Sequence, residues 1–128
     1  MSRALLDTSI FIAGEQERPL TGALPDQVAV SVVTLAELEV GVLVAADEDA
    51  RAQRMDTLVM ARERAAGIPI DQPVASAYAR LAAAALRAGR RPRIHDTWIA
   101  ATAVVHGAAV WTQDEDFTEF ADVEVVRV

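Results

Sequence analysis

The sequence predicts an α/β fold with three layers, in which helices cover both faces of a central, mostly parallel sheet. Short apolar runs alternate along the chain with longer stretches of helical period, a pattern typical of βαβ units with right-handed crossovers. The chain has 128 residues, of which 52% are hydrophobic, and this supports a packed core. No repeat, linker or low-complexity segment divides the chain, so we expect one domain over residues 1–128.

The first third of the chain is expected to contain two strands. Residues 3–7 form an apolar run that is too short for a helix, and Asp7-Thr8-Ser9 can cap a short helix beginning near Ile10. Residues 14–27 include two prolines and two glycines, which predicts a loop or a broken helix. Residues 28–31 are the second predicted strand.

The central part is expected to contain three helices and a short strand. Residues 34–46 carry apolar side chains at a period of three to four residues, and an acidic turn over 47–49 separates them from a second amphipathic helix over 50–66. Gly67 is expected to end that helix and residues 68–70 to form a strand. Pro73 and Gly89 bracket an alanine-rich helix over 73–88.

The last third predicts one helix and two strands. Residues 95–106 have a helical pattern that Gly107 closes, and the apolar run over 108–112 is too short for another helix. Residues 114–121 are expected to form a turn or short helix. The alternating pattern of 123–127 predicts a last strand.

Composition restricts the class of protein. The net charge of −7 argues against a broadly basic nucleic-acid-binding surface, and all twelve basic residues are arginine. The chain has no cysteine, which excludes disulfides, thiolate zinc sites and a catalytic thiol. No apolar run approaches the length of a membrane span and no secretory signal is recognisable, so we expect a soluble, cytoplasmic protein.

Four acidic residues are placed where a parallel sheet would bring them together. Asp7 follows the first strand, Glu37 lies in the helix after the second strand, Asp96 opens a later helix, and Asp114 follows the strand over 108–112. The carboxyl ends of parallel strands and the starts of the following helices share one edge of the sheet. Clustered carboxylates raise one another's pKa and destabilise the fold unless a cation holds them. The sequence therefore predicts a site for Mg²⁺ or Mn²⁺, which suit oxygen ligands better than zinc does.

Each of these four acids also has an ordinary structural explanation. Asp7 and Asp114 could be helix caps, and Glu37 and Asp96 could compensate the dipoles of their helices. Such helix-terminal roles can account for each acid separately. They account less well for all four acids at one edge of the sheet, because the repulsion between the carboxylates would then stay uncompensated.

Four short motifs resemble those of the PIN-domain nucleases, and above all the VapC-type toxins of prokaryotic toxin–antitoxin pairs. The motifs are Leu-Asp-Thr-Ser at 6–9, Ala-Glu-Leu-Glu-Val-Gly at 36–41, Asp-Thr-Trp-Ile-Ala-Ala-Thr-Ala at 96–103 and Thr-Gln-Asp-Glu-Asp-Phe at 112–117. The resemblance covers essentially the whole chain and implies a PIN-like three-layer domain. It implies metal-dependent hydrolysis of RNA phosphodiester bonds. The implied metal ligands and catalytic acids are Asp7, Glu37, Asp96 and Asp114, with Asp116 as an auxiliary ligand and Thr8, Ser9 and Thr112 in support.

Neighbouring polar residues are weaker candidates. Gln113 stands where the family often has a basic or small residue, which concerns substrate contact rather than metal binding. Glu39 should point away from the face of Glu37, because two residues separate them along one helix. His95 adjoins Asp96, and we expect it to serve at the helix start or the surface.

The resemblance also implies partners. Four arginines lie shortly before Asp96, namely Arg87, Arg90, Arg91 and Arg93. A basic loop is commonly just solvated. At the rim of an acidic pocket, however, it could bind RNA phosphates, and we favour that interpretation. A small antitoxin could lay a helix in an apolar groove of the helices over 34–46 and 50–66, and insert an arginine into the acidic pocket. The helix over 73–88 is the expected surface of a homodimer.

Other classes of protein remain open at this point. A receiver-type signalling module also clusters acids around Mg²⁺, but it needs adjacent acids after the first strand and a late lysine, and this chain has Asp7-Thr8 and no lysine. A haloacid-dehalogenase-type phosphatase would need an acid where Ser9 stands. A catalytically inactive PIN domain that only binds a partner is a further alternative, although every acidic position of the pattern is present.

Overall fold

A computed structural model describes residues 3–115, 117, 120 and 122–128 of the chain. This part contains a five-stranded sheet of order β3-β2-β1-β4-β5, and each pair of neighbouring strands is parallel. The strands are β1 (Arg3–Leu6), β2 (Val28–Ser31), β3 (Ala65–Ile68), β4 (Ala108–Thr112) and β5 (Val125–Arg127). The prediction of a parallel α/β sheet is confirmed.

Five helices of the described residues connect these strands, namely α1 (Thr8–Glu15), α2 (Val32–Leu43), α3 (Glu48–Arg64), α4 (Gln72–Arg87) and α5 (Ile94–His106). The residue before each of the first four helices accepts a hydrogen bond from the first turn through its side chain; these N-caps are Asp7, Ser31, Asp47 and Asp71. Gly107 ends α5 in the left-handed conformation with φ 60°, where a Cβ would be strained. Within the described chain, no helix has the length and apolar character that crossing a membrane requires.

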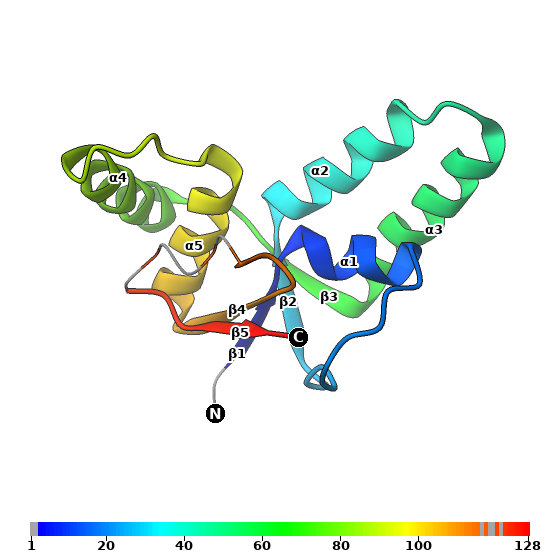
Figure 1. The fold of residues 1–128 in the computed structure, drawn as a ribbon, viewed down its shortest axis with the longest axis horizontal. Coiled ribbons are helices and arrows are strands. Elements are labelled where there is room, and N and C mark those ends of the chain that lie inside the picture. The colour runs from blue at the N-terminus through cyan, green and yellow to red at the C-terminus, as the bar shows by residue number, and fades with distance from the viewer. Residues whose placement is uncertain (1–2, 116, 118–119, 121) are drawn as a thin grey trace.

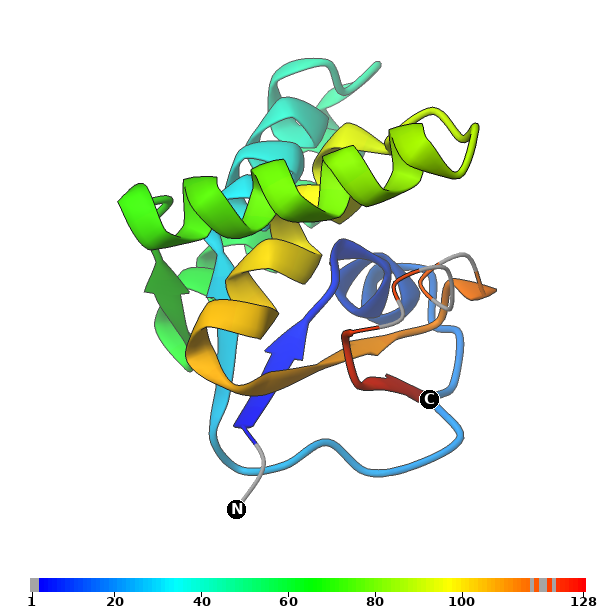
Figure 2. The ribbon, with the colours of Figure 1, turned by 90° about the vertical axis from the view of Figure 1, so that its left-hand side faces the viewer.

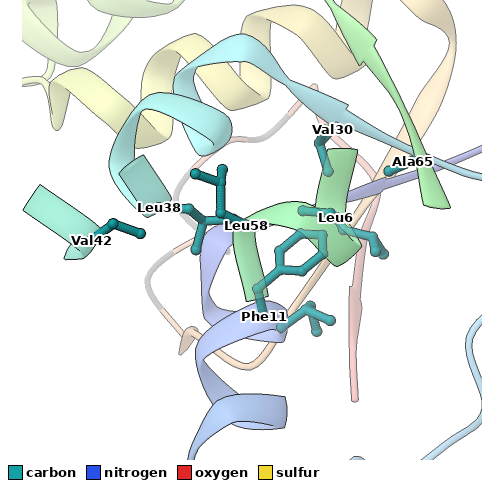
Figure 3. Packing of buried hydrophobic residues seen from close by; sticks show 9 residues of the cluster. Leu6, Phe11, Val30, Leu38, Val42, Leu58 and Ala65 are labelled. Atoms are coloured by element: carbon teal, nitrogen blue, oxygen red, sulfur yellow. The ribbon is translucent and has the colours of Figure 1, made fainter. Parts of the chain in front are cut away.

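The helices form two layers, as predicted. Figure 1 shows α1, α2 and α3 on one side of the sheet and α4 and α5 on the other. Successive side chains of β1 point to opposite faces, so that Leu6 packs with Phe11, Val30 and Leu58 under the first layer (Figure 3). Leu5 instead packs with Ile99, Val110 and other residues under α5. Burial of these two apolar faces holds the three layers together.

Several predicted boundaries differ from those in the structure. Strand β3 covers Ala65–Ile68 rather than 68–70, so that Gly67 lies inside a strand and does not end the preceding helix. Alanines at 65 and 66 favour a helix locally, but pairing of Ala65 with Val28 and of Gly67 with Val30 outweighs that preference. Helix α2 begins at Val32, two residues before the expected start, because the Ser31 hydroxyl already caps it.

The carboxyl ends of the strands lie on one edge, from which α1 and α2 start directly. In Figure 2, β1 and β3 point upward toward this edge, and α4 crosses above it. The strand order reverses around β1, since the chain places β2 and β3 on one side of β1 and β4 and β5 on the other. Such a reversal leaves a crevice beyond the carboxyl ends of the central strands, which is where ligands bind in open α/β sheets.

Candidate metal centre

Asp7 lies at the centre of this edge, directly after β1. Its backbone N–H donates to the Trp111 carbonyl at 2.9 Å, which fixes the end of β1 against the end of β4. Its side chain is only 5% exposed, and Oδ2 accepts hydrogen bonds from the Ser9 backbone N–H at 3.4 Å and from Thr112 Oγ1 at 2.8 Å. Asp7 is therefore both the cap of α1 and a buried carboxylate of the edge.

Thr112 links three segments of the edge. Its fully buried hydroxyl donates to Asp7 Oδ2 and accepts from the Asp114 backbone N–H at 2.9 Å. Ser9 Oγ lies 3.1 Å from Thr112 Oγ1 and accepts from the Gln113 N–H at 3.0 Å. Because the single Thr112 proton goes to Asp7, Ser9 is the donor to Thr112. These bonds hold the segment after β4 against the start of α1.

Glu37 reaches the same edge from the second turn of α2. Its Oε1 accepts from Thr8 Oγ1 at 2.9 Å, and Thr8 Oγ1 also lies 3.2 Å from Thr34 Oγ1. Its Oε2 is 3.5 Å from Nδ1 of His95, whose ring is largely exposed. The Glu37 carboxylate thus contacts both α1, through Thr8, and the start of α5, through His95.

Asp96 and Asp114 share an arginine. Nη2 of Arg93 lies 2.8 Å from Asp96 Oδ2 and 3.5 Å from Asp114 Oδ2. Arg93 precedes α5, Asp96 is in its first turn, and Asp114 follows β4, so the guanidinium joins two elements of the edge. The sequence interpretation placed Arg93 among the phosphate-binding residues, whereas here its guanidinium contacts the acids.

The charges of the four acids act on one another. Burial is the largest cause that raises the pKa of Asp96 from 3.8 to about 6; Arg93 lowers it, and the negative charges of Asp7, Asp114 and Glu37 raise it further. The carboxylates therefore repel one another across the edge, and the Arg93 guanidinium opposes that repulsion at Asp96.

The donor set fits a hard divalent cation. Four carboxylates with hydroxyl groups behind them supply oxygen ligands only, and their mutual repulsion would fall on binding a positive charge. In the part of the chain that the structure describes, no three His, Asp or Glu side chains are yet gathered closely enough to hold an ion. The fit thus rests on donor chemistry and charge.

Two pockets adjoin Glu37. One, of about 490 Å³, is lined by Glu37, Pro92, Arg93, Ile94, His95 and Asp96. The other, of about 300 Å³, lies between α1, α2 and α3 and is lined by Thr8, Ile12, Glu15, Gln16, Glu37, Leu38, Gly41 and Arg54. The Glu37 carboxylate can therefore be reached from both sides.

The remaining predicted residues lie around this centre. Arg87 is in the last turn of α4, and Arg90 and Arg91 are exposed in the loop that leads to α5. Asp116 lies outside the described residues. Glu39 is exposed and 3.4 Å from Arg62 on α3, away from the edge, as expected from its spacing.

The sequence interpretation missed Thr34. This fully buried residue of α2 lies beside Thr8 beneath Glu37. Its spacing of three residues from Glu37 was the available signal, because residues i and i+3 share one face of a helix.

Comparisons with known proteins agree with this architecture. The PIN domain family matches residues 4–123. Ribonuclease VapC5 of Mycobacterium tuberculosis is 50% identical and the match covers 97% of this chain and 94% of that protein; Ribonuclease VapC4 of the same organism is 45% identical, over 98% and 97%. Among solved structures, a member of the VapBC family of toxin–antitoxin systems, VapBC-5 from M. tuberculosis, superposes with a TM-score of 0.88 and 45% identity over the full length of both chains.

Proposed function

The chain belongs to the PIN-domain family, within which it is a VapC-type protein, and from this premise we propose that it is a metal-dependent endoribonuclease and the toxin of a toxin–antitoxin pair. The observation that carries the proposal is the convergence of charge on Asp96. Carboxylates from three other segments, at 7, 37 and 114, act on it at one edge of the sheet. Such a cluster of like charges is unfavourable unless a cation binds it.

The residues that would hold the ion are Asp7, Glu37, Asp96 and Asp114. Mg²⁺ or Mn²⁺ is the expected ion because every donor is an oxygen. When bound, a divalent ion lowers the pKa of a coordinated water and neutralises charge that develops on a phosphate.

The chain's own residues position these ligands. Thr112 and Ser9 fix the orientation of Asp7, and Thr8 orients Glu37 through hydrogen bonds of 2.8–3.4 Å. Hydroxyls placed behind a carboxylate in this way restrict its rotation and keep it in position as a ligand. Arg87, Arg90 and Arg91, at the rim beside α5, would bind phosphates of the RNA.

The antitoxin would bind the outer face of α2 and α3. Large apolar side chains are exposed on these two helices and at the end of α2, namely Val40, Leu43, Val44, Met55 and Val59, of which Leu43 is 70% exposed. An amphipathic helix lying there could continue into the adjoining 300 Å³ pocket and reach Glu37. VapBC-5 is described as a member of a toxin–antitoxin family, which supports such a partner for this chain. A homodimer through α4, where Leu86 is exposed, is a further part of the proposal, and the cytoplasm would be its place of action.

The test is cleavage of labelled total RNA by purified, antitoxin-free protein. We expect cuts with Mg²⁺ or Mn²⁺ that disappear with EDTA and with Glu37→Gln. Glu39→Gln is the matched control, because it removes the same charge from the same helix, two residues away, where the carboxylate faces Arg62. Cleavage that persists in folded Glu37→Gln, or that EDTA does not affect, would refute the metal-dependent mechanism.

The alternative of a receiver-like or inactive binding module is not favoured. The relatives at 45–50% identity are named ribonucleases. Absence of any cleavage by folded, metal-loaded protein, together with tight binding of a partner, would be the result that restores it.

A further inference from the structure

Arg93 contacts two of the four acids of the edge. Its guanidinium lies 2.8 Å from Asp96 Oδ2 and 3.5 Å from Asp114 Oδ2, and its side chain is 38% exposed. Arg93 is the residue before α5 but makes no capping hydrogen bond with its side chain, so the start of the helix does not require an arginine there. Its position is explained by the two carboxylates.

A neighbouring arginine of the same loop behaves differently. Arg91 is exposed, whereas Arg93 turns inward between α5 and the segment after β4. Charge-assisted hydrogen bonds from arginine to carboxylate are among the strongest in proteins, and they occupy oxygen lone pairs that a metal ion would use.

The arrangement of the acids is consistent with this occupation. Within residues 3–115, 117, 120 and 122–128, no three carboxylates or imidazoles form a group ready for an ion, and Asp96 and Asp114 are the two that Arg93 holds. Asp7 and Glu37 instead accept hydrogen bonds from the hydroxyl groups of Thr112 and Thr8, which can remain in place when a metal binds, and Glu37 also lies 3.5 Å from His95 Nδ1.

We propose that Arg93 is the resting counter-ion of the centre, bridging Asp96 and Asp114 in the metal-free protein and releasing at least one of them when a divalent ion binds. The inference rests on the proposed function for the existence of that ion. Arg93 is a positioning residue: it keeps like charges together without metal and competes with the metal for the same oxygens. At low metal concentration, Asp96 and Asp114 therefore stay paired with Arg93.

If Arg93 competes with the metal, removing its charge should raise the affinity for metal and lower the stability of the metal-free protein. Arg93→Gln should bind Mn²⁺ roughly tenfold more tightly than wild type. A nearby opposite charge, within ~4–6 Å, changes the pKa of a carboxylate by about 1–3 units, and we expect an effect at the lower end of this scale on its affinity for the metal. The same variant should melt at a lower temperature in EDTA, since its carboxylates lose their counter-ion. Arg91→Gln is the matched control, with the same change in the same loop, and should alter neither quantity appreciably. Arg93→Lys, which keeps the charge, should bind Mn²⁺ closer to wild type than Arg93→Gln does.

Mn²⁺ titration followed by electron paramagnetic resonance measures affinity without RNA or activity, and nitrogen-15 NMR of the arginine guanidinium groups follows the release directly. The Arg93 resonance should shift on adding Mg²⁺ while that of Arg91 stays in place. If Arg93→Gln binds Mn²⁺ no better than wild type, or the Arg93 resonance ignores Mg²⁺ that demonstrably binds, the inference is wrong although the metal centre stands. If folded wild-type protein and Arg93→Gln both fail to bind Mn²⁺, the proposed metal centre fails as well.

Discussion

Replacing Asp96 with asparagine should stabilise the metal-free protein. The raised pKa of Asp96, about 6 against 3.8, means that keeping this carboxylate charged in the fold is unfavourable. At about 1.36 kcal/mol for each pKa unit, the rise corresponds to roughly 3 kcal/mol, and this value is net because the attraction of Arg93 already opposes it. The Asp96 side chain is only 18% exposed, so water screens the interaction weakly.

The sign of the pH dependence follows from the direction of the pKa. The folded state binds the Asp96 proton more tightly than the unfolded chain does, so the penalty is complete above pH 6 and is lost as pH falls toward 3.8. The gain in unfolding free energy of Asp96→Asn should therefore approach roughly 3 kcal/mol at about pH 7.5 and shrink strongly by about pH 4.5.

Urea unfolding in EDTA, followed by circular dichroism at these two pH values, measures the gain. Asp56→Asn is the control, because Asp56 is an exposed acid on α3 far from the edge, and its substitution should change stability by less than about 0.5 kcal/mol. An Asp96→Asn protein that is no more stable than wild type at the higher pH, or whose gain is equal at both pH values, would refute the electrostatic reasoning. The same variant should lose RNA cleavage.

Three further predictions concern the surroundings of the centre. Thr112→Val should destabilise the protein by roughly 1–3 kcal/mol in thermal or urea unfolding, because the buried Asp7 carboxylate loses its 2.8 Å hydrogen bond. Replacing Arg90 and Arg91 with alanine should weaken RNA binding in filter assays and reduce the slope of log affinity against log salt by about 0.7 for each phosphate that is no longer neutralised. Leu43→Glu should weaken antitoxin binding by tenfold or more in calorimetry while changing stability by less than about 0.5 kcal/mol, because Leu43 is exposed.

Each of these has an outcome that contradicts it. Thr112→Val with unchanged stability would show that Asp7 finds another donor. Thr102→Val on α5 is the control, because this buried threonine donates to the Trp98 carbonyl of its own helix and not to a carboxylate. An unchanged salt slope would mean that Arg90 and Arg91 do not neutralise phosphates of the RNA. Leu86→Glu on α4 is the control for Leu43→Glu; antitoxin binding that falls equally in both variants would move the proposed interface.

The sequence was sufficient to predict the layers of the fold and the edge that carries the acids. Alternating strands and helices indicate a parallel sheet, and a parallel sheet places residues 7 and 114 on the same edge. The two lie close together because β1 pairs directly with β4. It was insufficient for β3, because Ala65 and Ala66 prefer a helix in isolation and form a strand only through pairing with β2.

Side-chain direction at the centre was harder to predict than position. Arg93 could be placed beside Asp96 from the sequence, but an arginine has many rotamers, and whether it turns to solvent or to the acids depends on where Asp114 lies. Thr34 escaped notice because a buried threonine in a helix usually has only a packing role. The roles of both residues depend on contacts between segments that are distant in the sequence, namely Arg93 with Asp114 and Thr34 with Thr8.

The hydrogen bond from Thr112 to Asp7 joins residues 105 positions apart, and β4 pairs directly with β1. During synthesis Asp7 is made long before Thr112 and Asp114, so a nascent chain lacks the assembled edge until these residues have also left the ribosome. The helices α2 and α3 lie between Asp7 and Thr112 in the sequence, so the proposed antitoxin surface is made before the edge can assemble.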